Sequence, residues 1–97
     1  MNIKLSALNV IEAEYKQFRL YNQLQQAQFL LTVNWNKIND ERLELGLPKI
    51  TNDATRKAYR RDKFSKDNEK ELGLELKYNA ALREYYDESK RQLQDND

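Results

Sequence analysis

The stretch ELGLPKITND, residues 44–53, holds the only proline of the chain and one of its two glycines. Gly46 can adopt the left-handed backbone conformation that ends many helices, and Pro48 cannot continue a helix. Thr51 or Asn52 then offers a side-chain oxygen that can cap the N-terminus of a new helix. The stretch therefore predicts a helix that stops, a short turn, and a second helix that starts.

Long uninterrupted segments flank this turn. The 97-residue chain has no glycine or proline between Ser6, a reasonable N-cap, and Thr32, and Asn34 can cap the short segment that follows. The predicted elements are a helix over about 6–32, a short helix over about 35–45, a turn over 46–52 and a helix over about 53–93. Gly73 costs about 1 kcal/mol in a helix interior. Ser65 or Asp67 could cap a separate fourth helix, so the sequence leaves open whether the last helix breaks near 64–73.

The first helix carries two apolar rows at three- and four-residue steps. One row consists of Leu8, Ile11, Tyr15, Phe18, Asn22 and Phe29. The other, about a third of a turn away, consists of Ala13, Gln17, Leu20, Leu24, Ala27 and Leu31. A helix with two such rows is usually held between two neighbours.

These patterns predict an all-α fold with one domain over residues 1–97. A chain of this length buries only about 60 to 65% of the surface that its unfolded form exposes, so its core is thin. We expect a helical hairpin or three-helix arrangement, with two long antiparallel helices, a short connecting helix and some self-association. A regular two-stranded coiled coil is not expected, because the row over residues 72–93 is polar at half of its later positions.

The composition excludes several function classes. The chain has no cysteine and no histidine, which removes thiolate zinc sites, Cys/His and Ser/His nucleophilic catalysis and most other transition-metal ligation. Its carboxylates alternate with Lys and Arg on polar helix faces, and its two glycines form no phosphate-binding loop. We therefore expect no enzyme, no catalytic residue, no metal and no cofactor. No apolar run is long enough to span a membrane, and a cytoplasmic location is expected.

Positive charge is concentrated after the turn. Residues 49–66 carry a net charge of +5 and residues 67–97 a net charge of −4, although the whole chain has +1. The cations that would share a helix surface are Arg56, Lys57, Arg60, Arg61 and Lys63. Clustered cations beside an aromatic residue suit phosphate binding and base stacking, so the basic segment 56–66 is a candidate nucleic-acid site. The sequence favours the alternative of a solvated helix face offset by the acidic end.

Six tyrosines are the other candidate functional residues. Tyrosine is enriched at interfaces because its ring can be buried while its hydroxyl stays wet. Tyr85 and Tyr86 are adjacent and cannot both point fully into one core. These two residues and Tyr21 are the candidate partner-binding residues. Trp35 is expected in the core, where it would attach the short helix to the hairpin.

The run VNWNKINDERLELGLPKITNDATRKAY, Val33 to Tyr59, resembles small uncharacterised helical proteins encoded in phages and prophages of Gram-positive bacteria. Those proteins share the tryptophan, the Gly-Leu-Pro-Lys-Ile turn and the Arg-x-Ala-Tyr helix start. The resemblance implies a phage origin, a helical fold and a place in the host cytoplasm, and it carries over no activity. It favours a protein-binding adaptor or inhibitor of host machinery, including defence systems such as CRISPR effectors. A nucleic-acid binder and a self-associating structural protein stay open as alternatives.

Overall fold

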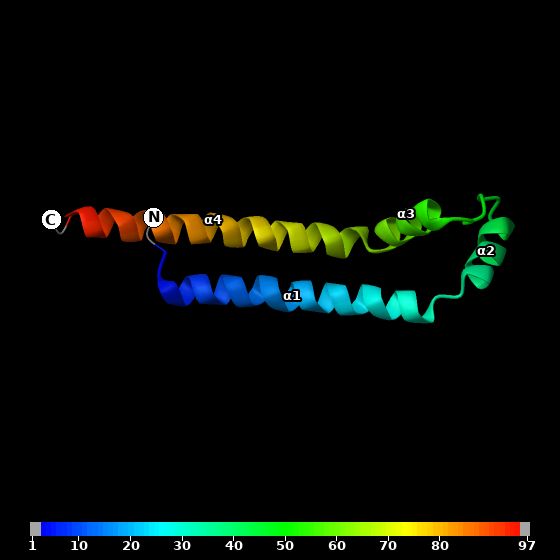
Figure 1. Ribbon diagram of the computed structural model, residues 1–97, viewed down its shortest axis with the longest axis horizontal. Coiled ribbons are helices and arrows are strands. Elements are labelled where there is room, and N and C mark those ends of the chain that lie inside the picture. Colours follow the sequence, from blue (N-terminus) through cyan, green and yellow to red (C-terminus); the bar gives the residue numbers. More distant parts are fainter. Residues whose placement is uncertain (1–2, 96–97) are drawn as a thin grey trace.

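The computed structural model describes residues 3–95, and within them every regular element is a helix. The four helices are α1 (Leu5–Thr32), α2 (Trp35–Glu44), α3 (Asp53–Lys63) and α4 (Ser65–Asp95). Helices α1 and α4 lie antiparallel and side by side, α2 closes one end, and α3 continues the line of α4 (Figure 1). The expected all-α fold, with its two long helices packed together, is confirmed.

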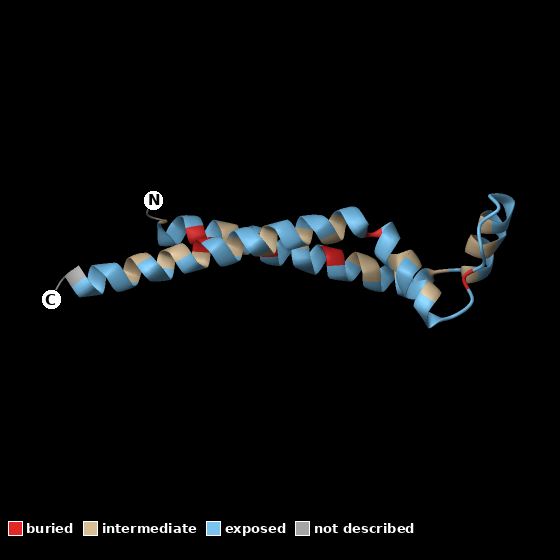
Figure 2. Ribbon diagram, turned by 90° about the horizontal axis from the view of Figure 1, so that it is seen from above, coloured by how far each residue is buried: buried red, intermediate tan, exposed pale blue. Residues whose placement is uncertain are grey.

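The molecule is long and thin. Its principal extents are 71 × 19 × 19 Å and its radius of gyration is 20.8 Å, against about 12.5 Å for a compact domain of 97 residues. Few positions along the hairpin are buried, and most of each helix is exposed (Figure 2). The structure therefore has a large surface for its mass.

The contact between α1 and α4 follows seven-residue steps. Leu8, Tyr15 and Asn22 are the buried residues of α1, and Ala81 is buried on α4. The rings of Tyr15 and Tyr78 stack with centroids 5.7 Å apart. Tyr78 and Ala81 lie outside the row over residues 72–93 whose polar positions argued against a coiled coil. The two helices of one chain therefore pack with a near-heptad spacing in a different register.

Halfway along the hairpin, polar side chains replace apolar ones. Asn22 is only 2% exposed, and its Nδ2 donates to Asn68 Oδ1 at 3.0 Å and to Glu71 Oε1 at 3.3 Å. Gln26 Nε2 donates to the side-chain oxygens of Asn22 and Asn68, at 3.0 and 2.9 Å, and Gln25 donates to Asp67. Because these amides satisfy one another, the polar layer fixes the register of the two helices without leaving Asn22 unpaired.

The turn after α2 has the geometry that its residues predict. Gly46 has a positive φ of 72°, its N–H donates to the Leu43 carbonyl at 3.1 Å, and the N–H of Leu47 donates to the Arg42 carbonyl at 2.8 Å. These two bonds form a Schellman motif. The side chain of Leu47 stays 44% exposed. Ile50 is buried instead. Its backbone N–H donates to Asn39 Oδ1 at 2.8 Å, and Asn39 Nδ2 donates to its carbonyl at 3.0 Å, so both backbone groups are satisfied.

The helix starts differ in how they are capped. Asn34 caps α2 by accepting from the Lys37 N–H, and Asn52 forms a reciprocal capping box with Thr55. The cap expected at Ser6 is wrong: α1 begins one residue earlier, at Leu5, so Ser6 lies inside the helix. Since the first-turn amides of α1 meet solvent, water can satisfy them.

The question of a break near 64–73 is decided by one residue. Phe64 lies between α3 and α4 with φ −103° and ψ 17°, and its side chain is buried. Gly73 lies inside α4 without interrupting it. Burial of the Phe64 side chain offsets the free-energy cost of the break between α3 and α4. At Gly73 no buried contact accompanies the glycine, and the helix continues.

The second apolar row of α1 lies farther round the helix than the expected third of a turn. Leu24 follows Tyr15 by nine residues, or two and a half turns at 3.6 residues per turn, and therefore lies on the opposite side of α1. Tyr15 is buried against α4, whereas Leu24 is 61% exposed. The row faces away from α4 with no neighbour among the described residues.

Candidate interaction surfaces

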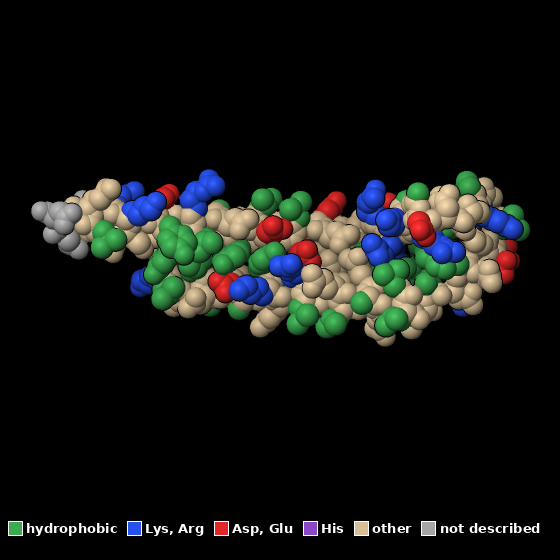
Figure 3. Space-filling model, viewed as in Figure 1, with side chains coloured by type: hydrophobic (Ala, Val, Ile, Leu, Met, Phe, Trp, Pro, Cys, Tyr) green, Lys and Arg blue, Asp and Glu red, His purple; other side chains and the backbone are tan. Residues whose placement is uncertain are grey.

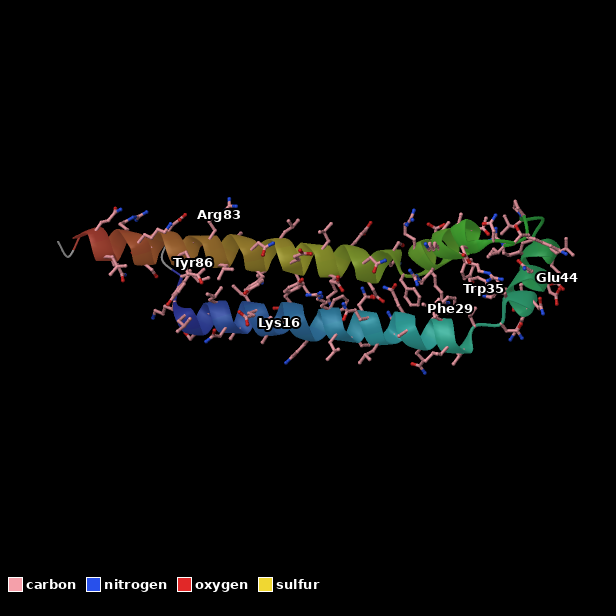
Figure 4. The ribbon with its side chains drawn as sticks, in the orientation of Figure 1. Lys16, Phe29, Trp35, Glu44, Arg83 and Tyr86 are labelled. Carbon is pink, nitrogen blue, oxygen red and sulfur yellow. The ribbon has the colours of Figure 1, made fainter. Side chains whose placement is uncertain are left out.

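An aromatic cluster fills the closed end of the hairpin. Phe29 meets Trp35, Tyr59 and Phe64 with ring centroids 6.0, 6.3 and 5.6 Å apart, and Trp35 meets Tyr59 at 5.7 Å. Phe29 and Trp35 are labelled at this end of the molecule in Figure 4. Trp35 is half-buried rather than fully enclosed. The cluster attaches α2 and α3 to the end of α1, which is the role expected for Trp35.

The five predicted cations of the basic segment share α3. Arg56, Lys57, Arg61 and Lys63 are exposed and Arg60 is half-buried, and blue side chains gather over α3 in Figure 3. Among residues 3–94, none of the five forms an ion pair with a carboxylate. The acidic residues of α4 extend away along the long axis, so they do not offset this patch at contact distance.

Two of these cations lie over aromatic rings. The Arg56 guanidinium lies 5.6 Å from the centroid of the Trp35 ring, and Lys63 Nζ lies 5.4 Å from that of Phe29. Such contacts hold a cation in place and keep its charge. The contact of Arg56 with Trp35 borders an open pocket of about 260 Å³ whose lining residues are Leu30, Val33, Trp35, Asp53, Arg56, Lys57 and Arg60. The pocket has an apolar wall and a rim of three cations and one carboxylate, Asp53, so its net positive charge favours an anionic group joined to a flat apolar one.

The structure does not bring the three candidate tyrosines together. Tyr21 on α1 is 56% exposed, and its hydroxyl donates to Gln25 at 3.1 Å. Tyr86 on α4 is 58% exposed, and its ring meets the half-buried Tyr85 ring at 6.1 Å. Asn22, the residue after Tyr21, is hydrogen-bonded to Glu71 on α4. Tyr86 lies fifteen residues beyond Glu71 along α4, or about 22 Å away. One small partner surface cannot contact all three.

Exposed apolar rows are the feature that the sequence did not assign to a surface. Large hydrophobic side chains are exposed on both long helices: Val10, Leu20, Leu24, Leu30 and Leu31 on α1, and Leu72, Leu76, Tyr86 and Leu93 on α4. Hydrophobic side chains also gather where α4 passes the start of α1 (Figure 3). The periodicity revealed these rows, but only the packing shows that one chain leaves them uncovered.

A small charged cluster joins the two long helices near their open end. Tyr78 on α4 donates from its hydroxyl to Glu12 Oε2 at 3.0 Å, and Lys16 donates to Glu12 Oε1 at 2.9 Å. The hydrogen bond from Lys16, and then that from Tyr78, lowers the pKa of Glu12 below its ordinary value of 4.5. The same carboxylate raises the pKa of Lys16 and the pKa of Tyr78. The cluster stabilises the hairpin electrostatically, and its three groups keep their usual charge states near neutral pH.

The described part of the chain offers neither a metal site nor a membrane-spanning helix. No group of acidic side chains there is placed to hold a metal ion. No described helix is both long and apolar enough to cross a lipid bilayer. The basic pocket and the apolar rows are the surfaces whose composition suits recognition of another molecule.

Comparison with protein-family models, with curated proteins and with solved structures finds no match to this chain. What the surfaces do must therefore be inferred from their own geometry.

Proposed function

We propose that this protein is a non-enzymatic interaction module, of the adaptor or inhibitor type, that binds another protein through the exposed face of α4. The observation that carries the proposal is the apolar row on this helix, where Leu72, Leu76 and Leu93 stay exposed together with Tyr86. Asn79, Arg83 and Lys90 interrupt this row, so the face offers separate apolar anchors within a polar surface, which is the usual make-up of protein interfaces. Tyrosine and leucine on one helix face supply the anchors that a partner groove can bury.

A groove beside Tyr86 supports the same face. It has a volume of about 540 Å³ and is lined by Asn79, Leu82, Arg83, Tyr86, Asp87 and Lys90. Arg83 and Tyr86 are both labelled on this part of α4 in Figure 4. Charges of both signs at the rim suit a partner with a mixed polar rim around an apolar anchor, which is the usual composition of protein interfaces.

The resemblance of residues 33–59 to phage and prophage proteins supplies the setting of the proposal. A phage protein acts in the cytoplasm of its bacterial host, so the partner we propose is a host or phage protein there. Host defence machinery is one class of such partners.

Affinity capture with matched variants tests the proposal. Wild-type protein should retain a stoichiometric partner from a Gram-positive bacterial lysate, and Leu76→Glu should lose it because the substitution places a charge in the contact. Gln92→Glu makes the same change of charge on α4 outside the row and should retain the partner. Equal recovery with Leu76→Glu and wild type would show that this face does not carry the function.

Nucleic-acid binding by α3 is a second candidate, favoured by the five cations that have no carboxylate partner among residues 3–94. Five phosphate contacts predict an affinity that falls with salt with a log-log slope of about −4. Fluorescence anisotropy with labelled DNA and RNA at several salt concentrations measures this slope. Reversing Arg60 and Arg61 to Glu should abolish such binding, and no binding at low salt would exclude this function.

A further inference from the structure

The row of α1 that faces away from α4 extends over three heptads. Counting from Val10, its members are Val10, Ala13, Gln17, Leu20, Leu24, Ala27 and Leu31, and all seven are exposed. Leu31 is 87% exposed. Hydrophobic side chains are visible along this edge of α1 in Figure 3. Steps of three and four that repeat every seven residues are the pattern of a helix seam that packs against another helix.

The C-terminal half of this row lies in an uncharged part of the chain. From Leu20 to Asn36 the chain has no charged residue. A partner helix with charges along its edges would bury them against this surface without counter-charges, which is unfavourable. In an antiparallel pair the neutral segments of two α1 copies meet at the central Leu20 and Leu24 layers, and Glu14 and Lys16 lie near the outer ends of the contact, where both side chains are exposed to water.

The surface of the chain is large enough for such a contact. Its accessible area is 7903 Å², whereas a compact monomer of this mass exposes about 5,800 Å². The excess of about 2,000 Å² exceeds the roughly 800 Å² that each partner contributes to a stable interface. A homodimer can therefore form and still leave the α4 face free.

We propose that two copies of this chain associate antiparallel along α1, with Leu20 of each copy against Leu24 of the other. In this register Ala13 faces Leu31 of the second copy, and Ala27 faces Gln17. Each small residue thus meets a larger one, which fills the seam. In a parallel pair every layer would join a residue to its own copy, and the two alanine layers would leave voids.

The antiparallel register also makes a prediction about distance. The two-fold axis passes close to Gln23, so the two copies of this residue lie beside each other. The two copies of Ala13 lie eighteen residues apart along the seam, or about 27 Å. A chain without cysteine allows one thiol to be introduced at either position.

Two measurements test the proposal. Sedimentation equilibrium over a range of concentrations should give a mass of twice 11.6 kDa for the wild-type chain. Leu24→Glu should weaken the dimer by at least about a hundredfold, because each copy would bury an unpaired charge. Since Leu24 is 61% exposed within one chain, the variant should keep its helical circular dichroism. A wild-type monomer at all concentrations, or a Leu24→Glu dimer of unchanged strength, overturns the proposal.

Cross-linking decides the orientation. A short bismaleimide should join two copies of the Gln23→Cys variant and leave Ala13→Cys as single chains, whereas equal cross-linking of both variants would overturn the antiparallel arrangement. This proposal concerns α1 and stands apart from the partner face on α4. Leu76→Glu should remain dimeric and Leu24→Glu should still capture the partner, so failure of one proposal is distinguishable from failure of the other.

Discussion

Asn22 on α1 and Asn68 on α4 are joined side chain to side chain, Nδ2 to Oδ1, at 3.0 Å in the middle of the hairpin. Asn22 is the most buried polar residue among those described, and the layer around it contains amides and carboxylates instead of leucines. Only one alignment of α1 along α4 pairs these groups. The layer therefore selects the register that a purely apolar seam would leave free to slide.

Removing the amide of Asn22 should destabilise the fold. Asn22→Ala leaves Glu71 without this donor and Asn68 with Gln26 as its remaining donor, and it removes one acceptor of Gln26, so we expect a loss of about 1–3 kcal/mol. Urea unfolding followed by circular dichroism at one fixed protein concentration measures this loss. Gln92→Ala truncates an exposed amide on α4 outside both proposed interfaces and should shift the free energy of unfolding by no more than about 0.5 kcal/mol. Equal effects of the two substitutions would contradict the role of the polar layer.

The contact between Tyr78 and Glu12 should make stability depend on pH. The pKa of Glu12 is lowered in the folded chain, so the stabilisation is fully present above its ordinary value of 4.5 and is lost as the pH falls through the folded pKa. Tyr78→Phe should therefore lower the melting temperature at pH 7, and this effect should become smaller as the pH is lowered below 4.5. Tyr21→Phe removes a hydroxyl that donates to the uncharged Gln25, and its effect should not change between these pH values.

Gly46 should not tolerate a side chain. Its φ of 72° lies in the left-handed region, where an added Cβ is strained even though no atom lies within 4 Å of it. We expect Gly46→Ala to destabilise the protein by about 1 kcal/mol, visible as a lower urea midpoint. An unchanged midpoint would mean that the Schellman turn contributes little to the fold.

Gly73 should respond in the opposite direction. It lies inside α4 with open space around the position of an added Cβ. Gly73→Ala removes the helix cost of glycine and should stabilise the protein by about 0.5–1 kcal/mol. The two glycine variants form a matched pair in thermal unfolding, and a destabilised Gly73→Ala would show that the glycine is needed for flexibility within α4.

The buried ring of Phe64 should be a main source of stability at the closed end. Phe64→Ala deletes its edge-to-face contact with Phe29 and leaves a cavity, with an expected cost of about 3–5 kcal/mol. Leu43→Ala truncates an exposed side chain on α2 and should cost far less. Denaturant midpoints of the two variants give the comparison, and similar midpoints would mean that the aromatic cluster is loosely packed.

Some features of the candidate surfaces could be predicted from the sequence. The adjacency of Tyr85 and Tyr86 required one of them to leave the core, and Tyr86 is the exposed one. The spacing of the cations placed them on one helix, where α3 has them. Their lack of carboxylate partners among residues 3–94 could not be predicted, because it depends on α4 leading the acidic residues away from α3.

The sequence by itself determined the local events. Gly46 ends α2, and Asn34 and Asn52 cap the helices that follow them, because each event depends on hydrogen bonds between residues within five positions of one another. Tertiary structure decided which apolar row of α1 turns inward and where α3 ends. The two rows are equivalent by period, and only tertiary contacts distinguish them: side chains of α4 satisfy Asn22, and Phe29 of the inward row packs against the buried Phe64.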